Sequence, residues 1–291
     1  MSVLDPSLRR GGDCSKQNTE CSTNTPVLLG VIHIVVRSPP HRSGLRHQQS
    51  EIDRNEGHTV STEWLEPDAN ARGSVVVIAG RGEHADVYGR FARRIAFDGY
   101  RVTVVENARE SVARALSSSQ IPGPLVVVGS DSGAVTALDI APEYPAVTGI
   151  VLAGLLVDGP PALPSEWDAE LDARSACPVH RGVLGKPDAI DRGALQEATS
   201  VATPESLARV TSPVLLVHGD ADTVSPVDPV LAASTALPDV RLTLVRGGRH
   251  DILNDVTHRS VAAEIVQFLE RLREPGGQDL LRREPVRTLA S

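Results

Sequence analysis

The chain has 291 residues, 41% of them apolar, which fits one large α/β domain with loose ends and a sizeable core. Its net charge of −8 argues against a nucleic-acid-binding protein, which would show a basic face. No apolar run reaches the roughly 18–20 residues that span a membrane, so we expect no stable membrane insertion.

The three cysteines, Cys14, Cys21 and Cys177, have no spacing that a metal site uses. Their odd number and the polar surroundings of the first two argue against a disulfide framework. We therefore expect a reducing compartment and a cytoplasmic protein. Nothing in the sequence implies a cofactor or a metal.

Residues 1–57 are rich in Arg, Ser, Gln, Asn, Pro and His and mostly lack helical or strand periodicity, which predicts a disordered extension. The exception is the apolar run Val27–Val36, which has the length of the core of a signal sequence. A long stretch of mixed charge precedes this run, and Arg37 follows it where a small-residue cleavage site would stand, so we do not favour a signal. The residues can also lie upstream of the true start codon.

From residue 58 to residue 273, predicted strands and helices alternate. Weak alternation of apolar and polar residues predicts an edge strand over 59–66. Apolar, mostly β-branched runs predict further strands at 74–79, 101–106, 125–129, 149–154, 213–218 and 240–245. Helices are predicted at 86–97, with Asp86 as N-cap, and at 107–116, 132–141, 226–237 and 258–273. This order predicts an α/β fold, with a mostly parallel twisted sheet and helices on both faces.

Residues 156–211 interrupt the alternation and predict a short cap, with helices at 166–174 and 188–198. The cap is rich in Leu, Ala and Pro, which indicates a small apolar substrate. Trp167 and His180 are its candidate substrate-binding residues. Residues 274–291 are predicted to be a disordered tail.

In the stretch Leu125–Ala134, an apolar run is followed by a sharp turn into a predicted helix, and Gly129 and Gly133 flank this turn. A strand, a tight glycine turn and a helix in this order form the nucleophile elbow of α/β-hydrolases. The residue midway between the glycines takes the nucleophile's place, and here it is Asp131. A register shifted by one residue places Ser132 there instead, at the cost of the leading glycine.

Two other predicted strands end in candidate partners for the elbow. Asp222 follows the strand at 213–218, and His250 follows the strand at 240–245. The carboxyl ends of parallel strands meet at one edge of a sheet, so the three side chains should converge. Asp220 is an alternative acid, but Pro226, four residues after Asp222, favours Asp222.

Two loops resemble those of one group of α/β-hydrolases. Gly80-Arg81-Gly82-Glu83-His84 is similar to the H-G-x-G-E-H loop of monoacylglycerol lipases and lysophospholipases, with Ala79 in place of the leading histidine. The stretch 249–255 (RHDILND) is similar to their R-H-E-L-x-N-E stretch. The resemblance covers about 59–273. It implies the backbone N–H groups of Arg81 and Ser132 as the oxyanion hole, Asp222 as the acid, His250 as the base, and a serine where Asp131 stands.

An aspartate in this position has its own chemistry. A helix N-terminus favours its negative charge, so the carboxylate needs no base and can attack an alkyl carbon to form an ester. Epoxide hydrolases and haloalkane dehalogenases of the superfamily work in this way. Their usual cap tyrosines are missing from this sequence, and Ser132 stands where dehalogenases usually carry a tryptophan.

We therefore expect a hydrolase that acts on a small apolar ester or lipid-like molecule through Asp131, His250 and Asp222. Against an ester carbonyl, Asp131 would form a labile anhydride or act as a base for water. One alternative is attack on an alkyl carbon through an Asp131 ester. Another is a ligand-binding protein without catalysis. In each case the expected partner is a small molecule.

Overall fold

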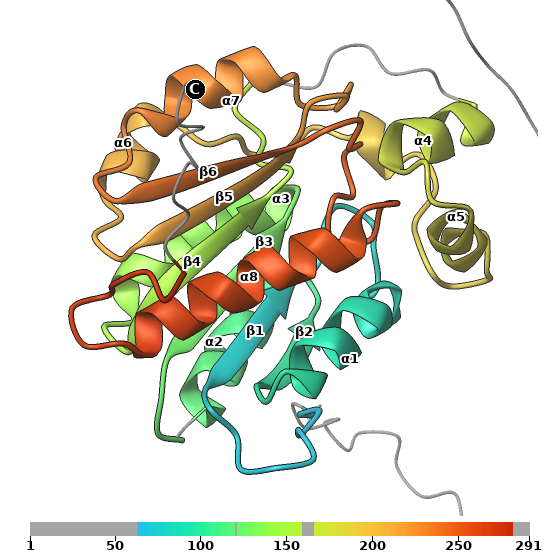
Figure 1. The fold of residues 1–291 in the computed structure, drawn as a ribbon. Helices are drawn as coiled ribbons and strands as arrows, with labels where there is room; N and C mark the ends of the chain where they lie inside the picture. Colours follow the sequence, from blue (N-terminus) through green and yellow to red (C-terminus); the bar gives the residue numbers. More distant parts are fainter. Residues whose placement is uncertain (1–62, 120, 159–165, 282–291) are drawn as a thin grey trace, which may run out of the picture. The chain divides into compact units, whose positions relative to one another are not determined.

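The computed structural model describes residues 63–119, 121–158 and 166–281 (Figure 1). The predicted extension over 1–57, with its apolar run, lies outside these residues. Of the predicted tail, residues 274–281 are described. They have no regular secondary structure, but Asp279 pairs with Arg241 of the last strand at 2.5 Å, so this part of the tail contacts the domain.

Six strands form one sheet in the order β2-β1-β3-β4-β5-β6, and every neighbouring pair is parallel. The strands are β1 (Ser74–Ile78), β2 (Arg101–Val105), β3 (Leu125–Ser130), β4 (Val147–Ala153), β5 (Val214–Gly219) and β6 (Val240–Val245). The predicted fold class is therefore confirmed. The expected edge strand over 59–66 is reduced, in its described part, to one antiparallel bridge from Leu65 to Val102. Pro67 follows closely, and a proline cannot donate to a strand ladder.

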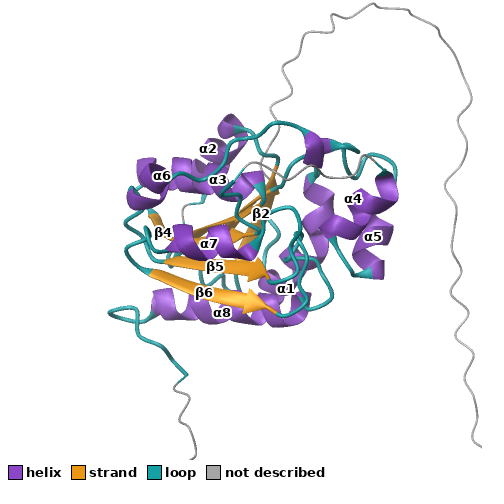
Figure 2. Ribbon diagram, turned by 90° about the horizontal axis from the view of Figure 1, so that it is seen from above, coloured by secondary structure: helices purple, strands orange, loops and turns teal. Residues whose placement is uncertain are grey.

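Helices cover both faces of the sheet (Figures 1 and 2). α1 (Gly89–Phe97) and α8 (His258–Arg273) pack on one face, where Val75 and Val77 of β1 point. The other face, with Val76 and Ile78, packs against α2 (Arg109–Ser118), α3 (Ser132–Ile140), α6 (Pro204–Ala208) and α7 (Val227–Ser234). Successive residues of a strand point to opposite faces, which explains why these strands are apolar throughout.

The helix predicted at 86–97 begins differently from the expectation. A 3₁₀ turn, η1 (Ala85–Tyr88), precedes α1, and Asp86 lies inside this turn, so it does not cap the helix. α2 begins at Arg109, two residues later than predicted. Ala108, which precedes the helix, is extended, and the amide group of Asn107 bonds to the hydroxyl groups of Ser132 and Thr136, at 2.9 and 2.7 Å.

The cap lies beyond the carboxyl ends of the strands (Figure 1) and contains α4 (Trp167–Arg174) and α5 (Pro178–Leu184). The helix predicted at 188–198 is wrong, since only the short turn η3 (Ala194–Gln196) forms there. Asp188 and Gly193 have φ values of 58° and 87°, which a right-handed helix cannot contain. No helix among the described residues is long and apolar enough to cross a membrane.

Candidate active site

Asp131 occupies the elbow between β3 and α3. Its φ of 52° and ψ of −121° are unusual for a residue with a side chain and cost about 1–3 kcal/mol. The surroundings enforce this conformation, since its N–H donates to the carbonyl oxygen of Ala153 at 2.9 Å. The two glycines are needed for close approach, because a Cβ on Gly129 would lie 2.2 Å from the carbonyl oxygen of Gly133. The sequence therefore builds a strained turn that presents one side chain.

Three loop residues meet at this turn. Nε2 of His250 lies 2.9 Å from Oδ1 of Asp131, and Nδ1 lies 2.8 Å from Oδ2 of Asp222. The other oxygen of Asp222 accepts the backbone N–H groups of Val224 and Ser225, at 2.8 and 2.9 Å. Loops that follow β3, β5 and β6 thus form one hydrogen-bonded chain, Asp222–His250–Asp131, which is buried throughout.

The two alternative residues lie elsewhere. Asp220 is exposed, and its carboxylate accepts the N–H of Gly247 at 2.6 Å. Ser132 is the first residue of α3, and its hydroxyl oxygen accepts a hydrogen bond from Asn107. The structure therefore brings Asp131 and Asp222, and not these neighbours, into contact with His250.

The side chain of Arg81 is a further part of the site, which the sequence analysis missed. Its backbone N–H, which the resemblance implies as an oxyanion-hole donor, donates to Oδ2 of Asp131 at 2.9 Å. Its Nε also donates to Oδ2, at 2.8 Å, and its Nη2 donates to Oδ1 at 3.0 Å. With His250, each carboxylate oxygen of Asp131 has two donors. A carboxylate in a buried turn needs a nearby positive charge, but this need does not identify the residue that supplies it.

The charges of these residues set their protonation states. Burial alone would lower the pKa of His250, but the charges of Asp222 and Asp131 and their hydrogen bonds outweigh burial and raise it to about 10. Burial likewise would raise the pKa of Asp131, yet the bonds and charges of His250 and Arg81 hold this pKa far below its usual range. At neutral pH the site therefore contains an imidazolium and an ionised aspartate.

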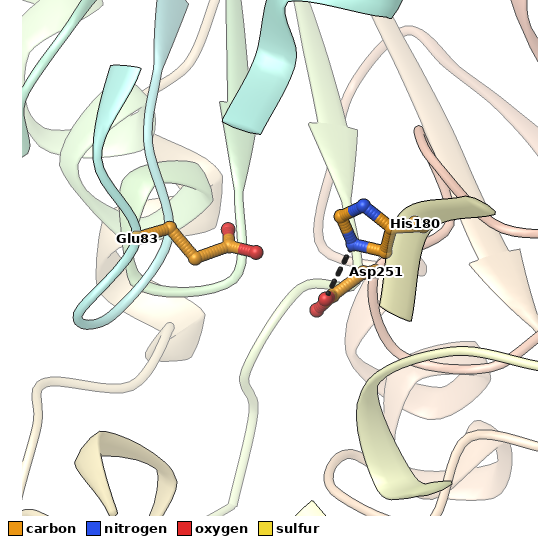
Figure 3. Close-up of side chains that lie close together, drawn as sticks. All are labelled: Glu83, His180 and Asp251. Atoms are coloured by element: carbon orange, nitrogen blue, oxygen red, sulfur yellow. Dashed lines mark hydrogen bonds and ion pairs between the residues drawn. The ribbon is translucent and has the colours of Figure 1, made fainter. Parts of the chain in front are cut away.

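A second buried cluster supports the loops from the cap side (Figure 3). Nε2 of His180 lies 3.0 Å from Oδ2 of Asp251, and the Glu83 carboxylate points toward this pair. Ligand-type atoms of these three residues lie within 4.8 Å of one another. However, Nη1 of Arg174 lies 3.7 Å from an oxygen of both Glu83 and Asp251, so a positive charge already occupies this place. Burial and the charge of Asp251 raise the pKa of Glu83 to about 8, although Arg174 opposes them.

This cluster connects the loops that carry Arg81 and His250. Nη2 of Arg174 donates to the carbonyl oxygen of Arg81 at 3.1 Å. The backbone N–H of Asp251 donates to the carbonyl oxygen of Arg174 at 2.8 Å. Helix α4 of the cap thereby ties the loop after β1 to the loop that carries His250.

Beside Arg81 lies a cavity of about 350 Å³. Most of its wall is polar: Arg81, Glu83, His84, Glu106, Asn107, Ser132, Asp191, Glu197 and Thr199 line it, together with Gly80, Gly82, Ala108 and Ala198. Neither Trp167 nor His180, the residues predicted to bind substrate, lines this cavity. Trp167 stacks under the guanidinium of Arg192, and His180 is buried against Asp251. The apolar wall expected from the cap's composition is likewise not found at this cavity.

The fold and the converging loops define an α/β-hydrolase architecture, and comparisons of this chain with known proteins agree. No model of a known protein family matches the chain. A monoacylglycerol lipase of Mycolicibacterium smegmatis is 26% identical over 257 residues, which cover 70% of this chain and 90% of the relative.

Solved structures of other proteins share this fold. A monoacylglycerol lipase of Paleococcus ferrophilus has a TM-score of 0.55 and 18% identity, over 72% of this chain and 99% of its own. A soluble variant of the monoglyceride lipase of Saccharomyces cerevisiae has a TM-score of 0.58 and 18% identity, over 73% and 91%. These findings confirm the resemblance to α/β-hydrolases and to the monoacylglycerol lipase group.

Proposed function

We propose that this chain is a hydrolase that cleaves a small ester or lipid-like substrate, with Asp131 as nucleophile, Asp222 orienting His250, and His250 moving the proton. The observation that carries the proposal is the continuous chain of hydrogen bonds from Asp222 through His250 to Asp131. The similarity to proteins named as lipases supports the substrate class.

The protonation states favour a carboxylate nucleophile. A serine would need a neutral histidine to remove its proton, whereas an ionised aspartate needs no base. His250, with its pKa raised to about 10, is a proton donor at neutral pH, and it contacts the nucleophile directly. The strongly lowered pKa of Asp131 makes this residue a poor base for water. We therefore prefer direct attack by Asp131, whose first step needs no proton transfer to this weakly basic carboxylate, to water activation by Asp131.

The steps balance as follows. Asp131 attacks the ester carbonyl, the C–O bond to the alcohol breaks, and His250 gives its proton to the leaving oxygen. This leaves a mixed anhydride on Asp131 and a neutral imidazole. His250 then takes a proton from water, the hydroxide attacks the acyl carbon, and the carboxylic acid and the Asp131 carboxylate separate. The acid releases its proton to solvent.

The cavity beside Arg81 supports an ester with a polar part. Its wall carries Glu106, Asn107 and Thr199, which can hydrogen-bond hydroxyl groups, and it reaches Ser132 at the elbow. We therefore propose that the alcohol portion of the substrate is polar, and that the ester carbonyl lies between this cavity and Asp131.

A second candidate is attack on an alkyl carbon, which the ionised Asp131 itself favours. In that reaction the carboxylate displaces a leaving group and becomes an alkyl ester, and water then cleaves this ester at the carbonyl of Asp131. Both candidates use the same residues, and they differ in where an oxygen from water ends.

The test is a single turnover in ¹⁸O-labelled water, with enzyme in excess over p-nitrophenyl butyrate or 1-butyrylglycerol, followed by mass spectrometry of the product and of the elbow peptide. Ester cleavage with attack at the acyl carbon places the label in butyrate. Alkyl chemistry, tested with a small epoxide or haloalkane, places it in Asp131. Hydroxylamine added during ester turnover should trap the anhydride as butyrohydroxamate.

Matched variants complete the test. Asp222→Asn should lower kcat by several orders of magnitude, because His250 loses the partner that orients it. Asp220→Asn, an exposed acid on the same loop, should leave kcat unchanged. The proposal fails if wild-type protein turns over none of these probes and forms no adduct at Asp131. If, in addition, His250→Ala binds 1-butyrylglycerol as tightly as the wild type does, the chain is a ligand-binding protein.

A further inference from the structure

The guanidinium of Arg81 is a buried cation between the cavity and the nucleophile. Arg81 is 7% exposed, and its Nε and Nη2 face Asp131. Its third nitrogen, Nη1, donates to the carbonyl oxygens of Leu195 and Glu197 in the cap, at 3.1 and 3.5 Å. The side chain therefore has one end on the reacting carboxylate and the other fixed by backbone.

Charge balance shows what this cation does during the reaction. At rest, Arg81 and the His250 imidazolium face two carboxylates, those of Asp131 and Asp222, and the four charges cancel. When Asp131 forms a covalent bond to substrate, it becomes neutral and one buried positive charge loses its partner. An unpaired buried charge is costly, so a negative charge that develops on the substrate oxygen at this moment is stabilised.

We propose that the Arg81 side chain is a catalytic residue that stabilises the oxyanion formed as Asp131 attacks. The inference rests on the proposed function, in which Asp131 is the nucleophile. The backbone N–H and the Nε of Arg81 already donate to the same oxygen, Oδ2 of Asp131, at 2.9 and 2.8 Å, so backbone and side chain act together beside the attacking carboxylate.

The guanidinium is held in advance of the reaction, which is what such stabilisation requires. The cap carbonyls of residues 195 and 197 hold its Nη1, and Arg174 holds the backbone carbonyl of Arg81 at 3.1 Å. These contacts do not involve Asp131, so they persist when its charge is lost. A lysine has no planar fork and cannot keep the cap contacts while it reaches both oxygens.

The experiment measures the covalent step by quench-flow with p-nitrophenyl butyrate in wild-type protein, Arg81→Gln and Arg81→Lys. Arg81→Gln keeps the backbone N–H and should slow p-nitrophenol release in the first turnover about 100- to 1,000-fold, with KM changed less than threefold. Arg81→Lys should show a smaller loss. In Arg81→Ala, added guanidinium ion should restore part of the lost rate. The control is Arg209→Gln, whose exposed ion pair with Asp139 lies on the surface, and it should behave as wild type.

The outcomes separate the two proposals. If wild-type protein forms the Asp131 adduct and folded Arg81→Gln forms it at the same rate, the role of Arg81 is overturned and the nucleophile stands. A rise in KM alone, without rescue by guanidinium, also overturns it. If wild-type protein forms no adduct, the proposed function fails and this inference fails with it. Should Arg81→Gln not fold, the rates of Arg81→Lys and its Asp131 adduct decide in the same way.

Discussion

Replacing Asp131 by asparagine should lower the pKa of His250 and expose how the site holds its proton. In the native protein the imidazole contacts two carboxylates at nearly equal distances, 2.9 Å to Asp131 and 2.8 Å to Asp222. Together they raise its pKa from 6.5 to about 10 against the opposing effect of burial. This shift corresponds to roughly 5 kcal/mol in favour of the imidazolium.

Asparagine keeps the shape of the side chain but removes one of the two negative charges. An opposite charge at this distance contributes about 1–3 pKa units, so the pKa of His250 should fall by that amount in Asp131→Asn. The fall should lie toward the upper end, because Arg81 loses its partner and adds an uncompensated positive charge beside the imidazole.

The assay is a pH titration followed by long-range ¹H–¹⁵N correlation of the imidazole nitrogens, with His250→Gln used to assign the signal among the nine histidines. The pH dependence of stability gives a second readout. The native state prefers the charged form, so its extra stability is complete below pH 6.5 and disappears as the pH rises toward 10. A wild-type His250 that titrates near 6.5, or one whose pKa does not change in Asp131→Asn, would refute this account of the site.

Three further predictions concern the support of the site and are measured by chemical denaturation. Gly133→Ala should lower the free energy of unfolding by about 1–3 kcal/mol or more, because its Cβ would lie 2.5 and 2.6 Å from two backbone oxygens at the end of β1. In the control Gly182→Ala, the added Cβ meets no atom within 4 Å, so this variant should not destabilise the protein. The pKa of Glu83 is raised from 4.5 to about 8, so the folded state holds this proton more tightly than the unfolded state does. The free energy of unfolding should therefore fall by up to roughly 5 kcal/mol as the pH rises from 4.5 to 8. Glu83→Gln should remove this dependence, and identical pH profiles of the wild type and the variant would contradict the prediction. Arg174→Met should cost about 3–5 kcal/mol, since it leaves the buried carboxylates of Glu170 and Asp251 without a counter-charge, while Arg209→Met at the surface should cost under 1 kcal/mol; equal costs would show that the buried pairing is not what matters.

The strands and the position of the elbow were predictable because local chemistry determines them. A run such as Val75–Ile78 is apolar on both faces, which suits only a strand covered on both sides. The glycines at 129 and 133 mark a turn that no larger residue allows. Elements with such strong local signals were placed to within a few residues, and the histidine and the acid followed from the edge where parallel strands end.

The cap and the counter-ion were not predictable in this way. Asp188, the first residue of the predicted helix, adopts a left-handed conformation that aspartate tolerates but that its residue type does not by itself predict. The contact of Arg81 with Asp131 joins residues fifty positions apart, and it depends on how far a flexible side chain turns inward. Pairing of this kind is decided by packing and charge in three dimensions, where a sequence pattern carries little information.

Arg81 also changes the meaning of the aspartate. Considered alone in the sequence, Asp131 replaces a serine and lacks the tyrosines or tryptophan that usually assist an aspartate in this position. In the structure it is one half of an ion pair whose other half, Arg81, also lines the cavity. Removing either member leaves a buried charge, so the two residues depend on each other energetically. An aspartate at this elbow is therefore best understood together with its arginine, which supplies the hydrogen-bond donors that the sequence otherwise lacks.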